Sequence, residues 1–137
     1  MIAFSPEQAM VRLLTLILIS ISANALAYDS DGVKTHFGLE IAECAAYFTI
    51  TAEVSNYFGN ISAGMALQRD AERAMEMGRM LTTEELARAR YESALEAEAK
   101  TNNKKNGYSK LFRRYERSCQ AIMEHPEQRI EYWEKKK

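Results

Sequence analysis

A methionine cluster in the stretch MEMGRM is the first group of side chains that could do chemistry. It contains Met75, Met77 and Met80. Thioether sulfur is a soft ligand that suits Cu(I), so this cluster is one candidate metal site. On a straight helix, however, Met75 and Met77 point in different directions, and only Met77 and Met80 could converge without a further ligand. Methionine is also an adaptable packing residue, so we expect packing or partner contact here, with copper binding as the alternative.

A basic stretch over residues 100–117 is the second candidate site. It holds seven lysines and arginines against one acid, with aromatic residues between them. The residues that we expect to form a binding surface are Lys104, Lys105, Lys110, Arg113, Arg114 and Arg117. Such a surface suits an anionic membrane surface or an acidic protein, and nucleic acid is the less accessible partner for an exported chain. The aromatic spacing also matches an inward helix stripe, so the alternative is a solvated basic face.

Residues for catalysis are few. The chain has two histidines, His36 and His125, and neither lies in a recognised nucleophile pattern. The sequence lacks GxSxG, HExxH and phosphate-binding glycine loops. His36, Glu40 and Glu43 have the spacing of metal ligands, although acids near a helix N-terminus are also favoured by the helix dipole. We expect neither an enzyme nor a bound cofactor.

The two cysteines, Cys44 and Cys119, belong to no CxxC or CxxCH pattern. In an oxidising compartment two such cysteines most simply form one disulfide. A bond between them closes a long loop, which is worth about 4 kcal/mol in the chain-entropy account. Two free buried thiols and intermolecular pairing are the alternatives.

The N-terminal residues have the features of a secretory signal peptide. Arg12 is followed by the apolar run LLTLILISIS, and the residues at 25–27, ALA, fit the cleavage rule. We expect a signal peptide over residues 1–27 and a single exported helical domain over residues 28–137. The residues before Met10 make a poor n-region, which suggests that translation begins at Met10. The alternatives are an uncleaved membrane anchor and a buried helix of a cytosolic protein.

Composition favours an all-α fold. The 137 residues are 47% hydrophobic and 27% charged, which is ordinary for one globular domain. Two prolines and six glycines are few, and long stretches lack the alternation of β-strands. The net charge of -1 means that the positive field of the basic stretch is local.

The expected central element is a helix over residues 38–58. Its apolar residues, among them Phe48, Val54 and Phe58, leave no wide polar face, so we expect this helix to be buried. The polar residues before it, Tyr28–Phe37, are predicted to form an extended lead-in or turn.

The second expected helix covers residues 61–80, with Asn60 or Ser62 as its N-cap. One face forms what we call the seam: Gly64, Leu67, Ala71, Ala74, Gly78 and Leu81. Glycine inside a helix costs about 1 kcal/mol, so its recurrence predicts a close approach to the first helix. If the seam is not covered within the chain, it predicts a homodimer.

Two further helices and a terminal turn complete the prediction. A capping box at Thr82–Glu85 starts a helix that ends near Lys100. Its apolar, inward set is expected to be Leu86, Ala87, Tyr91, Ala94, Leu95 and Ala97, and its acidic face is expected to be solvated: Glu92, Glu96 and Glu98. The loop Thr101–Gly107 reverses the chain. The inward stripe of the fourth helix is Tyr108, Leu111, Phe112, Tyr115, Cys119 and Ile122. Pro126 ends that helix and begins a short one anchored by Ile130 and Trp133.

The sequence therefore predicts a small antiparallel all-α bundle of about four helices plus a short C-terminal turn, with one disulfide. We expect a periplasmic or secreted protein that acts through binding, as an envelope-associated accessory, inhibitor or adaptor protein. Its partner is an unknown protein or an anionic envelope surface. The alternatives are a periplasmic carrier of Cu(I) or a small ligand, and a membrane-anchored structural component held by an uncleaved N-terminal helix.

Overall fold

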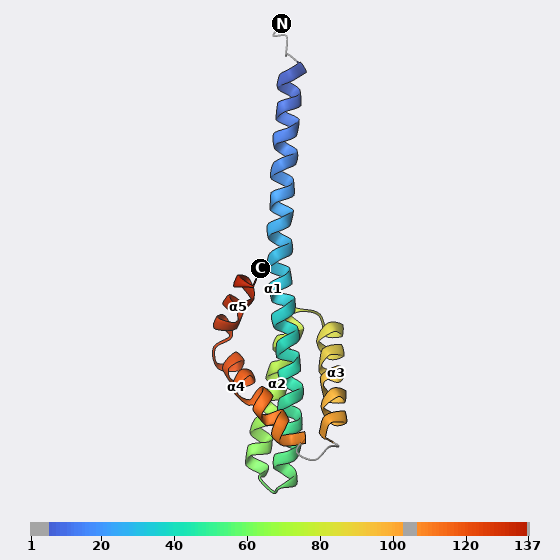
Figure 1. The fold of residues 1–137 in the computed structure, drawn as a ribbon, viewed down its shortest axis with the longest axis vertical. Helices are drawn as coiled ribbons and strands as arrows, with labels where there is room; N and C mark the ends of the chain where they lie inside the picture. The colour runs from blue at the N-terminus through green and yellow to red at the C-terminus, as the bar shows by residue number, and fades with distance from the viewer. Residues whose placement is uncertain (1–5, 103–106, 137) are drawn as a thin grey trace. The chain divides into compact units, whose positions relative to one another are not determined.

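The computed structural model describes the backbone of residues 6–102 and 107–136, and the side chains of residues 32–101 and 108–136. All regular secondary structure in these residues is helical, which confirms the all-α prediction. The helices are α1 (Pro6–Tyr57), α2 (Ile61–Leu81), α3 (Glu84–Asn102), α4 (Gly107–Glu124) and α5 (Pro126–Lys135). The chain divides into two units, Met1–Gly32 and Val33–Lys137, and the second unit contains α2 to α5 (Figure 1).

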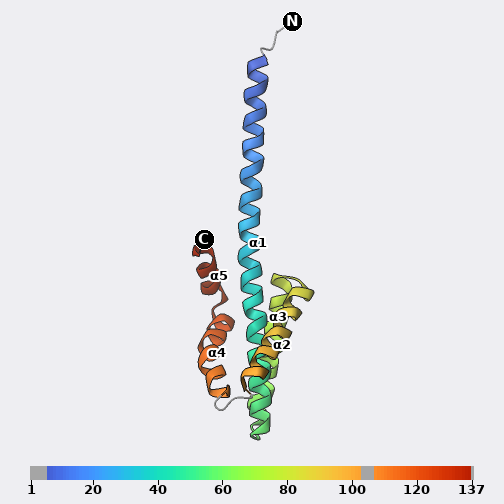
Figure 2. The same cartoon turned by 45° about the vertical axis from the view of Figure 1, so that its right-hand side comes forward.

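Within the second unit, α1 is the helix on which the others pack, and α1 to α4 run alternately in opposite directions (Figures 1 and 2). The core of the unit is rich in residues of α1, among them Phe37, Ile41 and Ala45. This confirms the buried central helix for most of its length. Its end differs from the prediction, because Phe58 is 78% exposed at the turn into α2, where the chain leaves the bundle core.

The extended lead-in predicted for Tyr28–Phe37 is wrong, because α1 runs through these residues. The DSDG stretch favours a turn, and Gly32 costs about 1 kcal/mol inside a helix. Continuing the helix, however, places Phe37 in the core at 1% exposure. Burying a phenylalanine is worth roughly 1.5–3 kcal/mol, which outweighs the local preference. Part of the predicted signal peptide, residues 6–27, also lies in α1.

The seam of α2 lies against α1 at short range, as predicted. A Cβ atom on Gly78 would lie 3.1 Å from the carbonyl oxygen of Gly38 and 3.4 Å from the Cβ of Ala42. A Cβ atom on Gly64 would overlap the side chain of Asn56. Glycine at these positions therefore lets the two backbones approach each other.

The predicted homodimer through Gly64–Leu81 depended on a seam left open by the chain itself. In the structure Ala71 and Ala74 are buried, and α1 covers the seam at Gly78. The seam is therefore covered within the chain at these residues, and the homodimer itself stays a prediction.

The helix caps between α1 and α3 are partly as predicted. The side chain of Asn60 accepts a hydrogen bond from the amide of Ala63, which confirms Asn60 as the N-cap of α2. The predicted N-cap of α3 is wrong by one residue: Thr83 accepts the bond from the amide of Leu86. Thr82 is not free for this role, because its amide and hydroxyl both donate to the carbonyl of Gly78 at the end of α2.

The predicted inward and outward faces of α3 need two corrections. Leu86, expected inside, is 47% exposed in the first turn of the helix, whereas its neighbour Ala87 is fully buried. Glu98, expected in solvent, is only 8% exposed. Its spacing explains this, since Glu98 follows Tyr91 by seven residues and Ala87 by eleven, which places all three on one helix face.

The inward stripe of α4 is confirmed for Leu111, Cys119 and Ile122, which are all buried. Tyr108 is the exception, because it lies in the first turn of α4 and is 46% exposed. The predicted loop is shorter than expected: Thr101 belongs to α3 and Gly107 begins α4. Residues 103–106 of that loop lie outside the described residues.

The last helix, α5, begins at Pro126 as predicted, with proline in the first helical turn. Ile130 and Trp133 pack against the core and anchor it. Of the helices that the structure describes, none has both the length and the hydropathy needed to cross a membrane.

Cys44 on α1 and Cys119 on α4 form a disulfide, with an S–S distance of 2.10 Å and a Cα–Cα distance of 5.4 Å. Both residues belong to the core, at 2% and 0% exposure. The predicted pairing is therefore present in the structure, and it joins the central helix to one wall of the groove that is described next.

Candidate binding groove

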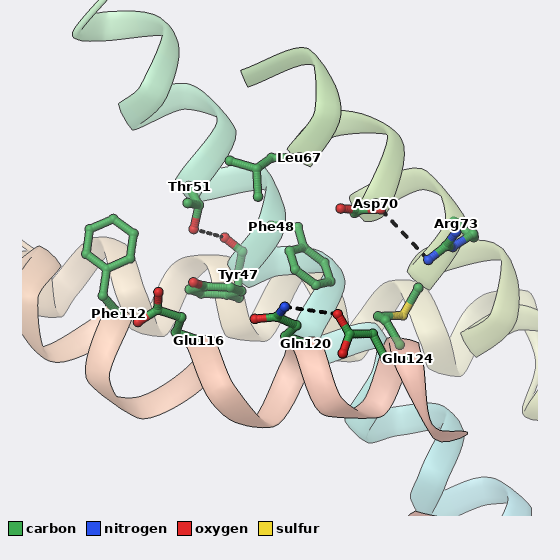
Figure 3. Close-up of a pocket in the computed structure, with 11 residues that line it drawn as sticks. Tyr47, Phe48, Thr51, Leu67, Asp70, Arg73, Phe112, Glu116, Gln120 and Glu124 are labelled. Carbon is green, nitrogen blue, oxygen red and sulfur yellow. Dashed lines mark hydrogen bonds and ion pairs between the residues drawn. The ribbon is translucent and has the colours of Figure 1, made fainter. Parts of the chain in front are cut away.

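A groove of about 450 Å³ lies on α1 between α2 and α4 (Figure 3). The residues that line it are Tyr47, Phe48, Thr51, Leu67, Asp70, Arg73, Phe112, Glu116, Gln120, Met123 and Glu124. The groove exists because of the packing order of the helices: α2 packs on α3 and α3 packs on α4, whereas α2 and α4 flank an open strip of α1.

The floor of the groove is aromatic and already packed. The ring of Tyr47 lies 5.4 Å from that of Phe48 and 6.5 Å from that of Phe112, measured between ring centroids. Tyr47 and Phe48 are only 5% and 6% exposed. Burial raises the pKa of Tyr47, although its side-chain interaction with Thr51 acts in the opposite direction. The floor is therefore preformed, as is common in binding sites, and little of either ring is exposed.

The partly exposed apolar residues are on the two walls. Leu67 on α2 and Met123 on α4 pack against the core but are not buried. Phe112 and Met123 are eleven residues apart on α4, so the apolar part of this wall is about 16 Å long. That length corresponds to three turns of a helix.

The two walls differ in charge. On α2, Asp70 and Arg73 form an ion pair at 3.9 Å, so this wall is close to neutral. On α4, Glu116, Gln120 and Glu124 recur every four residues and form one row along the helix. Gln120 donates a hydrogen bond of 2.9 Å to Glu124 (Figure 3). The α4 wall is therefore acidic.

A polar contact at Glu43 fixes the position of the acidic wall relative to the floor. The carboxylate of Glu43 on α1 accepts a bond of 2.9 Å from Arg90 on α3 and one of 3.0 Å from the hydroxyl of Tyr115 on α4. One side chain thus links three helices. Burial, the negative charge of Glu43 and the bond to it raise the pKa of Tyr115 to about 12, and Glu98 contributes in the same direction.

We predict from this contact that Tyr115 lowers the stability of the protein at alkaline pH. The pKa of this phenol is about 12 in the folded state and about 10 in the unfolded state, so the folded protein keeps the proton to a higher pH. The free energy of unfolding should therefore fall as the pH rises from about 10 to about 12. Urea unfolding across this range should show a smaller fall for Tyr115→Phe. The exposed control, Tyr57→Phe, should follow the wild type, and equal slopes for all three proteins would contradict the assignment.

A second polar contact, at Glu40, fixes α5. Arg129 donates to the carboxylate of Glu40 from its Nε, at 2.8 Å and 3.0 Å, and also from its Nη2, and the indole of Trp133 donates to the same carboxylate at 3.0 Å. The ring of His36 stacks on Trp133 with centroids 5.0 Å apart. The metal-like spacing of His36, Glu40 and Glu43 is therefore used for contacts between helices. Among the described residues, no group of three His, Cys, Asp or Glu side chains could hold a metal ion.

The binding surface predicted from the basic stretch does not line the groove. Lys110, Arg113, Arg114 and Arg117 are exposed, and Arg114 lies over the ring of Tyr115 at 5.2 Å. Lys104 and Lys105 lie outside the described residues.

The three methionines of the candidate copper site have different surroundings. Met75 and Met77 pack against the core, whereas Met80 is 70% exposed.

A second exposed apolar area lies at the turn between α1 and α2. Tyr57 is 85% exposed, and its ring contacts that of Phe58 in an edge-on arrangement at 5.3 Å. Together with Val54 and Tyr108, these rings line a hollow of about 460 Å³. Large exposed apolar side chains often mark contact surfaces, so this turn competes with the groove as a binding surface.

Comparisons with known proteins were made by sequence family, by individual sequence and by structure. No family model, curated protein or solved structure matches this chain. The case for function therefore depends on the groove itself.

The groove was not predicted from the sequence, although the sequence contains the polar row that forms one of its walls. Glu116, Gln120 and Glu124 are polar residues beside the inward stripe of α4, and their spacing of four predicts a shared face. The missing information was the order of the helices around α1, which decides whether that face meets another helix or solvent.

Proposed function

We propose that this chain is an exported binding protein that holds a helical segment of a partner protein in the groove between α2 and α4. The observation that supports the proposal most is the aromatic floor on α1, which has a helix on each side and no helix of the second unit above it within the described residues. Amphipathic helices bind to apolar grooves of this kind through residues spaced three and four apart.

The dimensions of the groove suit a helix. A partner helix of about three turns would cover the apolar wall from Phe112 to Met123. Its apolar stripe would contact Leu67, Phe112 and Met123, which are the partly exposed residues, above the packed rings of Tyr47 and Phe48. The partner would then take the place of a further helix of the bundle.

The compartment is part of the same proposal. The apolar run after Arg12 and the small residues at 25–27 support export by a signal peptide, with the protein periplasmic or secreted. The disulfide between Cys44 and Cys119 is compatible with an oxidising compartment. Retention of the N-terminal helix as a membrane anchor is the alternative form of the same binding protein.

One observation favours a second candidate function, the carriage of a small ligand. A volume of about 450 Å³ is within the usual range of small-molecule sites. Such a ligand would also rest on the rings of Tyr47 and Phe48, so the two candidates share a site and differ in what fills it.

The test is binding of a neutral model peptide to the oxidised full chain. The peptide is an amphipathic helix with leucines spaced three and four apart and glutamines on its other face, carrying a fluorescent label for anisotropy. We expect Leu67→Glu to weaken binding at least about tenfold, because a charge would then face the apolar stripe. Leu86→Glu, which places the same charge on an exposed leucine outside the groove, should bind like the wild type.

Three results would contradict the proposal: no binding, equal loss in both variants, or equal binding in all three proteins. Tight binding of a small apolar dye that Leu67→Glu abolishes, with no binding of the peptide, would favour the carrier function instead.

A further inference from the structure

We infer that the partner helix is basic, with two lysines or arginines seven or eight residues apart on the flank that faces α4. The inference rests on the proposed function and adds the chemical class of the partner. It follows from the charges of the two walls.

The acidic wall is what selects the partner. Glu116 and Glu124 line the groove on α4, whereas the charges of the α2 wall, Asp70 and Arg73, already pair with each other. Among the described residues, Glu116 has no ion pair, and Glu124 receives its hydrogen bond from the neutral amide of Gln120. Both carboxylates therefore keep a negative charge available to a partner, and cations on the facing helix complement it.

The spacing of the two carboxylates sets the spacing of the cations. Glu116 and Glu124 are eight residues apart, which is about 12 Å along α4. A partner helix that packs nearly parallel or antiparallel to α4 advances by the same rise per residue. Residues seven or eight positions apart lie on one side of that helix, so two long basic side chains there can reach both carboxylates.

The basic residues of α4 do not reverse this selection. Arg113 and Arg117 are exposed but do not line the groove. By helix spacing they lie on the same side of α4 as Gln120 and Glu124, which are seven residues further along, at the outer edge of this wall. A helix bound in the groove would contact Glu116 and Glu124, which line it, whereas Arg113 and Arg117 do not line it.

Because Glu116 and Glu124 are exposed, their effect is on selection more than on total affinity. We expect the preference for a basic over an acidic helix to be about tenfold at low salt. It should shrink as salt screens the charges.

The experiment uses three helical peptides with the same leucine stripe. The flank carries two lysines, two glutamines or two glutamates at positions seven apart. In the oxidised full chain the lysine peptide should bind most tightly and the glutamate peptide least tightly. Glu116→Lys/Glu124→Lys should reverse this order. Glu92→Lys/Glu134→Lys, which changes the net charge equally at exposed glutamates that do not line the groove, should keep the wild-type order.

A fourth peptide tests the geometry by carrying its two lysines opposite the leucine stripe, where they face solvent whichever way the helix runs in the groove. It should bind less tightly than the first lysine peptide. Equal binding of the two, or a reversed order in the control variant as well, would overturn the inference, because the effect would then come from net charge alone.

Failure of the inference and failure of the proposed function give different results. If all peptides bind with one affinity and Leu67→Glu abolishes binding, the groove still holds a helix and the inferred basic partner is wrong. If no peptide binds, the proposed function fails and the inference with it. Circular dichroism of each variant checks that the exposed substitutions leave the fold unchanged.

Discussion

Reduction of the bond between Cys44 and Cys119 lowers the free energy of unfolding by about 4 kcal/mol in our account. The two cysteines are 75 residues apart, so the bond removes a large part of the freedom of the unfolded chain. Small domains are stable by about 5–15 kcal/mol in total, which makes this loss a large fraction. Urea unfolding followed by circular dichroism, with and without a phosphine reductant, measures it.

The control for this experiment is the double variant Cys44→Ala/Cys119→Ala, whose stability should not respond to reductant. Two results would contradict the account. One is an equal free energy of unfolding for the oxidised and reduced wild type. The other is an intact mass that reduction leaves unchanged.

Gly78→Leu should destabilise the protein by about 3 kcal/mol, because overpacking at this site meets backbone. The first added carbon would lie 3.1 Å from the carbonyl oxygen of Gly38, and the rest of the leucine would have to enter α1 near Ala42. Neither atom belongs to a flexible side chain end, so relief requires that α1 and α2 move apart. The midpoint of thermal unfolding should fall accordingly.

Gly32→Leu is the matched control, since it places the same side chain on α1 where no atom lies within 4 Å of the added Cβ. That variant should be as stable as the wild type or more stable by up to about 1 kcal/mol, from helix propensity alone. A neutral Gly78→Leu would mean that α1 and α2 do not pack closely.

The sequence predicted those parts of the fold that depend on local pattern and on chain composition. The recurrence of glycine and alanine in the seam predicted the close approach of α2 to α1, since glycine is costly in a helix without such a reason. The inward position of Cys119 followed from its spacing to Leu111 and Ile122. The pairing with Cys44 then followed because no other cysteine exists.

Prediction from the sequence failed where two residues compete for one role, or where packing between helices decides whether a residue is buried. Both Thr82 and Thr83 can cap a helix, and the choice of Thr83 depends on Thr82 bonding back to Gly78. Glu98 was expected in solvent because of its charge, although its spacing places it on the inward face of α3. Its burial beside Tyr115 could be known only from the packing of α3 on α4.

The groove is the clearest case of what sequence reasoning lacked. The aromatic residues of α1 and the polar row of α4 were all visible as helix stripes. The predicted binding surface of lysines and arginines in the basic stretch is a separate surface, and it stays a prediction. The structure shows the glutamates of the same helix lining the groove, and the arginines outside it.

The central claim is that binding takes place in the groove. The most direct measurement is an NMR titration, in which the backbone amide shifts of the ¹⁵N-labelled oxidised protein are followed as the lysine peptide is added. The account predicts that the largest shifts occur at Tyr47, Leu67 and Gln120, one on each of the three helices that line the groove. Largest shifts at Arg113 and Arg114, or at Tyr57 and Phe58 in the exposed turn, with none at those three amides, would contradict it.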